Sequence, residues 1–245
     1  MNQVRWNIEH LDQIDSTNAY VARLARGGAI EGTVAFSDFQ SAGRGRLDRE
    51  WRAAPGTSLL CSALLSPPRL ALTWVVAAAA LSLSDALDEL TGARPVLKWP
   101  NDVLYADAKV AGFLADAVAT DPPSVVVGLG LNLTGVDPSF VAATTVLAAT
   151  GHRLVPPQVL RVYLDRLAER RESLASPDGI ESLRFDYLRS LSTIDQQVRI
   201  ELPGSFVRGR AIGIDRTGAL QVQVGSAVRV FSAGDVVHLR REEEE

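Results

Sequence analysis

Residues 40–51 read Gln40-Ser41-Ala42-Gly43-Arg44-Gly45-Arg46-Leu47-Asp48-Arg49-Glu50-Trp51. Glycine lets a backbone approach a ligand closely, and the guanidinium fork of arginine matches phosphate and carboxylate oxygens. Glycines and arginines packed this closely suit neither a helix nor a core, so the segment predicts a loop. Taken alone, this loop is as consistent with a solvated basic surface as with a site for an anionic small molecule.

The composition bounds the class of protein. The chain has 245 residues, of which 47% are apolar and 22% charged, and this predicts a globular protein with a real core. Its formal net charge of -4 provides no overall basic field for nucleic acid. The single cysteine, Cys61, excludes a disulfide within the chain, and a cytoplasmic location is expected.

Residues 1–11 lack the apolar segment of a signal peptide. The apolar run 70–83 is too short to cross a bilayer and predicts a buried helix.

Hydrophobic periodicity divides the chain into two parts. Up to residue 192 it predicts an α/β (α+β) domain, and the expected strands are 6–11, 33–39, 58–65, 96–99, 109–117 and 125–133. The expected helices are 16–27, 73–90, 156–174 and 179–191. From there on, five short runs separated by turn residues predict a small all-β barrel: 197–202, 206–214, 219–224, 227–231 and 236–239. We therefore assign 1–192 to a main domain and 193–245 to a C-terminal domain with an acidic tail, Glu242 to Glu245.

A second candidate motif is Lys98-Trp99-Pro100-Asn101-Asp102. Proline ends the strand and turns the chain, which places a lysine, an amide and a carboxylate near the end of the sheet. The lysine can bind phosphate oxygen, and Asp102 or Asn101 can hold Mg²⁺ directly or through water. An ordinary Asn-Asp turn is the structural alternative.

Two further features lie in the following strands. Lys109 opens an apolar run, where it either meets an anion or guards an edge strand. Gly128 and Gly130 interrupt another apolar strand, which costs stability unless a backbone or ligand approaches closely there. Asn132 offers a donor and an acceptor at the end of that strand.

Several common catalytic motifs are absent from the sequence. No phosphate-binding loop of the Gly-x-x-x-x-Gly-Lys type occurs. The three histidines, His10, His152 and His238, show no metal-ligand spacing and no neighbouring acid, and Cys61 is expected in the core. If the protein is an enzyme, its nucleophile therefore belongs to a substrate, and the protein supplies positive charge and positioning.

In their order along the chain, these motifs resemble the biotin protein ligases (biotin–[acetyl-CoA-carboxylase] ligases). The matching segments are Ser16-Thr17-Asn18, Gln40 with Gly43-Arg44-Gly45-Arg46, Trp51 with Pro55-Gly56, Lys98 to Asp102, Lys109 to Gly112, and Gly128 to Asn132. The resemblance implies a mixed β-sheet backed by helices, similar to class II aminoacyl-tRNA synthetase cores, followed by an SH3-like domain. It also implies two steps: biotin and ATP give biotinyl-5′-AMP, and a lysine of the biotin carboxyl carrier protein then takes the biotin.

The resemblance assigns roles to individual residues. The residues expected to bind biotin are Ser16, Thr17, Asn18, Gln40, Gly43, Arg44, Gly45, Arg46, Lys109 and Gly112. The residues expected to bind ATP are Arg44, Arg46, Arg49, Trp51, Lys98, Asn101, Lys109 and Asn132. Lys109, Arg44 and Arg46 are the expected catalytic residues, and Asp102 is the expected Mg²⁺ ligand. The arginine loop is expected to close over the adenylate.

This sequence departs from the family pattern at two positions. Asp48 stands where the family commonly has glycine, and Asp116 stands where it commonly has glutamate. Many bacterial relatives also carry an N-terminal winged helix, but only about fifteen residues precede Ser16, too few for such a domain. We therefore expect no DNA-binding repressor function, no membrane partner, and a monomer or weak homodimer.

Three alternatives to a biotin ligase stay open from the sequence. A lipoate or octanoyl ligase would use the same core. A non-catalytic sensor would keep the pocket for biotin or adenylate without turnover. A β-barrel adaptor acting through 197–239 would leave the motifs of the first 133 residues unexplained.

Overall fold

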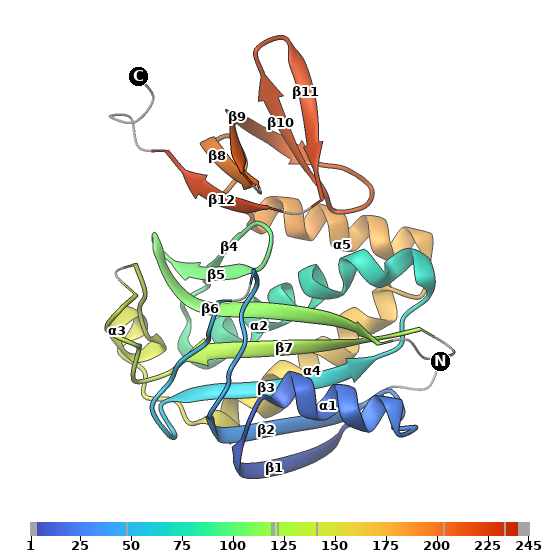
Figure 1. The fold of residues 1–245 in the computed structure, drawn as a ribbon, viewed down its shortest axis with the longest axis vertical. Coiled ribbons are helices and arrows are strands. Elements are labelled where there is room, and N and C mark those ends of the chain that lie inside the picture. The colour runs from blue at the N-terminus through green and yellow to red at the C-terminus, as the bar shows by residue number, and fades with distance from the viewer. Residues whose placement is uncertain are drawn as a thin grey trace.

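A computed structural model describes residues 4–47, 49–118, 121, 123–140, 142–202, 204–232 and 234–239. It contains a seven-stranded sheet with the order β1-β2-β3-β7-β6-β5-β4 and a five-stranded sheet with the order β11-β10-β9-β8-β12 (Figure 1). In the large sheet β1 and β2 are parallel, and the other neighbours pair antiparallel. This confirms the predicted mixed α/β fold with a separate C-terminal antiparallel sheet.

The elements follow the chain in one order. The strands of the large sheet are β1 (Asn7–Ile14), β2 (Thr33–Gln40), β3 (Ser58–Leu65), β4 (Val96–Lys98), β5 (Asp102–Tyr105), β6 (Ala108–Val118) and β7 (Ser124–Asn132). The helices are α1 (Thr17–Arg26), a 3₁₀ turn (Arg69–Trp74), α2 (Val75–Thr91), α3 (Val146–Thr150), α4 (Pro156–Ser173) and α5 (Pro177–Ser190). The small sheet contains β8 (Gln197–Leu202), β9 (Ser205–Ile214), β10 (Leu220–Val224), β11 (Ala227–Phe231) and β12 (Asp235–His238).

The large sheet carries helices on both faces (Figure 1). Alternate residues of β2 point to opposite sides, as strand geometry requires. Phe36 belongs to the main core with α2 and α4, whereas Ala35 packs against α1. Helix α1 packs on this face against β2, β3, β6 and β7, and its Asn18 lies on Gly128 in the middle of β7.

The helical segment after β3 corrects one expectation. The 3₁₀ turn and α2 together run over 23 residues, Arg69–Thr91, so the segment is long and apolar enough to cross a membrane by length and composition. However, 72% of the most apolar 18-residue stretch of this segment is buried inside the protein. Its alanines Ala77 to Ala80 are all buried in the main core, which is the packing of a core helix.

The sequence did not predict the short elements β5 and α3, and the alternative that Lys109 guards a sheet edge is wrong. The four residues of β5 lie inside the expected turn after Pro100, and α3 has only five residues. Because β5 pairs with one side of β6 and β7 with the other, β6 is an internal strand. Lys109 therefore does not guard a sheet edge.

Two buried tryptophans of the main domain hold the small sheet in place. Trp74 donates its indole N–H to the carbonyl of Arg216 at 3.1 Å, and Trp99 donates to the carbonyl of Gly218 at 3.0 Å. Both acceptors lie in the turn between β9 and β10. The small sheet is thereby fixed beside the ends of β4 and β5 (Figure 1).

Candidate active site

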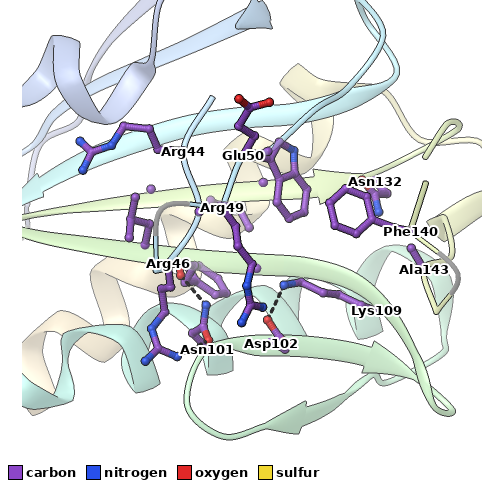
Figure 2. A pocket seen from close by; sticks show the side chains of 18 of the residues that line it. Arg44, Arg46, Arg49, Glu50, Asn101, Asp102, Lys109, Asn132, Phe140 and Ala143 are labelled. Carbon is purple, nitrogen blue, oxygen red and sulfur yellow. Dashed lines mark hydrogen bonds and ion pairs between the residues drawn. The ribbon is translucent and has the colours of Figure 1, made fainter. Parts of the chain in front are cut away.

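A cavity of about 320 Å³ lies on the α1 face of the large sheet, under the arginine loop (Figure 2). Apart from Gly43, every residue that the resemblance assigned to biotin, ATP or Mg²⁺ lines it. Gly43 instead accepts a hydrogen bond from the backbone of Trp51 and closes the base of the loop. Motifs separated by more than a hundred residues in sequence thus meet at one site.

The floor of the cavity is made of glycines. Gly112 of β6 pairs with Gly130 of β7, and the indole of Trp51 lies so close to both that a side chain at either position would meet it. The close approach predicted for the glycines of β7 is therefore made by side chains of the same protein. The indole Nε1 of Trp51 is buried and makes no hydrogen bond to the described residues.

Lys109 lines the cavity beside Asp102 and Trp51. Its Nζ is 2.6 Å from Oδ1 of Asp102, the contact drawn as a dashed line in Figure 2, and 5.7 Å from the centre of the Trp51 ring. Lys98 lines the same cavity, and burial, aided by the charge of Lys109, lowers the pKa of its ammonium group. Of the 25 basic residues in the sequence, these two are the only lysines. Both compact ammonium groups thus lie in the cavity, and every basic side chain outside it is an arginine.

The arginine loop is held from two sides. Arg44 lies 3.5 Å from Asp116, the shortened acid that the sequence analysis noted. Arg46 donates to Oδ1 of Asn101 at 3.1 Å and to the carbonyl of Gly234, and burial lowers the pKa of its guanidinium. Since Gly234 precedes β12, the small sheet takes part in the site.

Asp235 is a lining residue that the sequence analysis missed. It forms an ion pair with Arg49 of the arginine loop. Nothing local in the sequence marks it, because its contact depends on how the two sheets pack. Asp107 and Phe140 also line the cavity and were missed. Asp48 and the tail Glu242 to Glu245 lie outside the described residues.

Two asparagines occupy fixed positions. Asn101 donates from Nδ2 to the carbonyl of Phe113 at 2.7 Å, so its oxygen is the atom that faces Arg46. Asn132 donates to the carbonyl of Thr144 at 3.2 Å. Both side chains are therefore oriented by the backbone of neighbouring segments.

His238 of β12 lies beside the site and gives a pH-dependent prediction. Burial, reinforced by the charge of Lys98, lowers the pKa of His238 from 6.5 to about 4. Between these values the unfolded chain binds a proton that the folded protein does not, so wild-type stability falls as pH decreases from 6.5 to 4. We expect the free energy of unfolding of His238→Gln to decrease less steeply with falling pH than that of wild type, by about 1 kcal/mol per pH unit. Urea unfolding at several pH values measures both slopes.

His152 provides the control for this experiment, because it is exposed and lies between α3 and α4, outside the small sheet. His152→Gln should follow the wild-type pH dependence. Equal pH slopes for His238→Gln and wild type would contradict the prediction.

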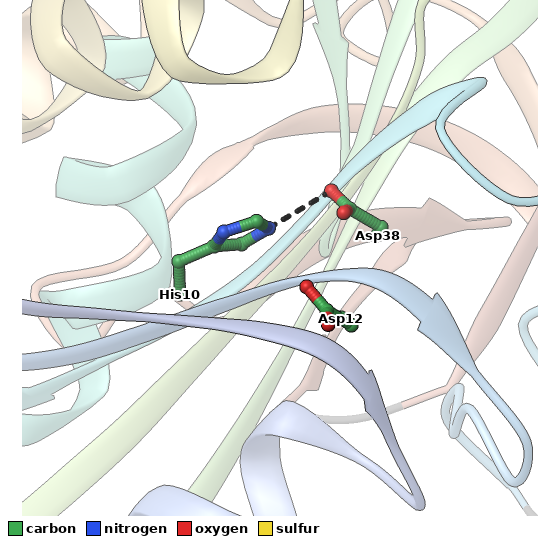
Figure 3. Close-up of side chains that lie close together, drawn as sticks. All are labelled: His10, Asp12 and Asp38. Carbon is green, nitrogen blue, oxygen red and sulfur yellow. Dashed lines mark ion pairs between the residues drawn. The ribbon is translucent and has the colours of Figure 1, made fainter.

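His10 corrects the expectation that the histidines have no acid partner. Its Nε2 lies 3.1 Å from Oδ1 of Asp38, and Asp12 lies beside them (Figure 3). The parallel register of β1 and β2 pairs His10 with Phe36 and brings these residues to one face of the sheet. His10 and Asp12 are exposed, Asp38 is half-buried, and none of the three lines the cavity.

Cys61 lies in β3 and is buried in the core, as predicted. Burial raises the pKa of its thiol to about 12, so it is held as a neutral thiol rather than a nucleophilic thiolate.

Comparison with known proteins agrees with this geometry. Residues 11–132 match the model of the biotin/lipoate A/B protein ligase family, and residues 193–239 match the biotin protein ligase C terminal domain. The chain is 39% identical to the biotin--[acetyl-CoA-carboxylase] ligase of Mycobacterium tuberculosis, over 93% of this chain and 87% of the relative. It is 32% identical to the enzyme of the same name from Paracoccus denitrificans, over 92% of this chain and 98% of that relative.

A solved structure agrees as well. The biotin protein ligase from Aquifex aeolicus in complex with biotin and ATP superimposes with a TM-score of 0.82 at 27% identity, covering 96% of this chain and 99% of that one. On the family models, the relatives and the shared fold, the chain belongs to the biotin protein ligase family.

Proposed function

We propose that this cavity joins biotin to AMP at the expense of ATP and then passes biotin to a lysine of the biotin carboxyl carrier protein of acetyl-CoA carboxylase. The observation that carries the proposal is the distribution of groups along the cavity. Ser16, Thr17 and Asn18 at the start of α1 line one part of the cavity, where Asn18 and Arg44 both contact Asp116. Lys109 and Arg46 lie in another part, against Asp102 and Asn101. A ligand with a polar ring and an anionic tail fits this arrangement.

In the first step, a carboxylate oxygen of biotin attacks the α-phosphorus of ATP, and the bond to pyrophosphate breaks. Both reactants are anionic, so cations that lie ready at the reacting atoms lower the barrier. Lys109 would leave Asp102 and bridge the carboxylate and the α-phosphate. Arg44 and Arg46 would stabilise the charge on the transferred phosphate from the loop.

The remaining residues would bind the nucleotide. We assign Arg49, Lys98 and Asn101 to the phosphates and Trp51 and Asn132 to the adenosine side. The carboxylate of Asp102 is an oxygen donor of the kind that Mg²⁺ prefers, and it faces the cavity. Bound Mg²⁺ would offset phosphate charge, and Asp102 is the residue that would hold it.

In the second step, the neutral amine of the acceptor lysine attacks the carbonyl carbon of biotinyl-AMP, and AMP leaves. The arginine loop has to shield this mixed anhydride from water until the acceptor arrives. The hydrogen bond from Arg46 to Gly234 and the ion pair between Arg49 and Asp235 support that role, because they hold the loop against the small sheet.

The finer organisation of the protein also belongs to this proposal. We place the boundary between the two domains at residue 192, where the pattern of α5 gives way to short strands. We also propose a cytoplasmic enzyme that acts as a monomer or weak homodimer. The net charge of -4 supports the further proposal that it binds no DNA.

The direct test is pyrophosphate release by the purified protein. With biotin, ATP and an acceptor domain, we expect release of pyrophosphate and a mass increase of the acceptor. Lipoate and octanoate in place of biotin serve as matched substrates, because they also carry a carboxylate on an alkyl chain. Activity with lipoate but not with biotin would overturn the proposal. Biotin binding without pyrophosphate release would point to a sensor.

A further inference from the structure

A buried hydroxyl lies directly behind the part of the cavity that the start of α1 lines. Ser62 is on β3, is fully buried, and does not line the cavity itself. Its neighbour across the sheet is Gly128 of β7, where a side chain would overlap the Asn18 amide. The side chain of Asn18 therefore lies flat on the sheet next to Ser62.

The Ser62 hydroxyl donates its single hydrogen bond to the side chain of Asn18. Its Oγ lies 2.6 Å from Oδ1 of Asn18 and 2.8 Å from Oγ1 of Thr17. An amide oxygen can only accept, so Ser62 donates to Asn18. The Thr17 hydroxyl then donates to Ser62 or to Oε1 of Gln40, which lies 3.0 Å away.

The nitrogen of the Asn18 amide is bound on its other side. Its Nδ2 lies 3.2 Å from the carbonyl of Leu114 and 3.2 Å from Oδ2 of Asp116. These two acceptors use both of its protons. The amide thus has no donor left for a ligand, whereas its oxygen keeps one free lone pair.

We propose that Ser62 is a positioning residue that holds the Asn18 amide with its oxygen available to the ligand and so favours ligands whose head group carries N–H donors. The inference rests on the proposed function, since biotin carries two such donors in its cyclic urea. Lipoate and octanoate have no N–H group at the corresponding end and would leave the amide oxygen unpaired. Ser62 thereby contributes to the choice between biotin and the alternative acids.

The test is calorimetric titration of biotin and octanoate into wild-type protein and Ser62→Ala. We expect the Kd for biotin to rise about 10-fold in Ser62→Ala, the size expected for loss of a buried hydrogen bond. The Kd for octanoate should not change, so the preference for biotin narrows by the same factor. At saturating biotin, kcat for pyrophosphate release should equal that of wild type. Ser62→Cys, which keeps a weak donor, should give a Kd between the two and serves also if Ser62→Ala does not fold.

Ser82→Ala is the matched control. Ser82 is also fully buried and donates to a single carbonyl, that of Ala78, but it lies on α2 away from the cavity. It should lower the midpoint of thermal unfolding to a similar extent without changing either Kd. An unchanged Kd for biotin in Ser62→Ala, or an equal loss for biotin and octanoate, would overturn the inference alone. Failure of the wild-type protein to bind biotin would overturn the proposed function as well.

Discussion

Lys109→Ala should lower the rate of biotinyl-AMP formation by about 10²–10³-fold, the loss typical of removing one group that stabilises charge in a transition state. Lys109 lines the cavity, and the sequence has no lysine besides Lys98 that could replace it. The substitution also leaves the carboxylate of Asp102 without its partner at 2.6 Å. Uncompensated negative charge at this point would add to the repulsion between carboxylate and phosphate. Single-turnover measurement of adenylate formation gives the rate directly.

Two variants make this result interpretable. Lys109→Arg keeps the positive charge but replaces a compact ammonium by a planar fork, so partial activity is expected. Arg161→Ala removes an exposed cation from α4, away from the cavity, and should behave as wild type. A Lys109→Ala enzyme within about threefold of the wild-type rate would show that positioning by the other residues suffices. Loss of biotin binding without any wild-type transfer activity would instead favour the sensor.

Arg46→Gly should release biotinyl-AMP about 10- to 100-fold faster than wild type, the range expected for a lost hydrogen bond to a charged group. Arg46 is the arginine of the loop that bridges both sheets, through Asn101 and the carbonyl of Gly234. Burial lowers the pKa of its guanidinium, so its charge lies in a partly desolvated site where attraction to phosphate is stronger than in water. Its removal eliminates the hydrogen bonds to Asn101 and Gly234 as well as the proposed contact to the adenylate phosphate.

Filter-binding or stopped-flow measurement of adenylate release tests this prediction. Arg46→Lys should fall between the two proteins, because it keeps the charge without the paired donors. Arg52→Gly provides a control from the same segment, since Arg52 pairs with the exposed Glu50 at the rim. Release at the wild-type rate from Arg46→Gly would remove Arg46 from the lid.

The sequence predicted those features that depend on local patterns. The bounds of β3 were predicted to the residue, because eight apolar or small residues stand between turn signals. The start of α1 was predicted as well: Ser16 caps it by accepting from the backbone of Ala19. The grouping of the candidate residues came from the ordered motifs rather than from any spacing between them.

Features that depend on packing between distant segments were missed. Asp235 reaches Arg49 only because the turn after β9 docks on two tryptophans of the main domain. Ser62 reads as one more small residue in a buried strand until the register places it opposite Gly128. His10 and Asp38 are joined by the parallel pairing of β1 and β2, which the sequence does not reveal.

The confinement of both lysines to the cavity has a consequence for the enzyme's own surface. Biotinyl-AMP is an acylating reagent toward any neutral primary amine, and lysine side chains supply nearly all such amines on proteins. Since the sequence holds no lysine besides Lys98 and Lys109, adenylate that escaped the lid would find no side-chain amine outside the cavity to modify. The other 23 basic side chains are arginines, whose guanidinium groups remain protonated and unreactive. Side-chain self-biotinylation outside the cavity is thereby excluded, and the reactive intermediate is left to the lysine of the partner protein.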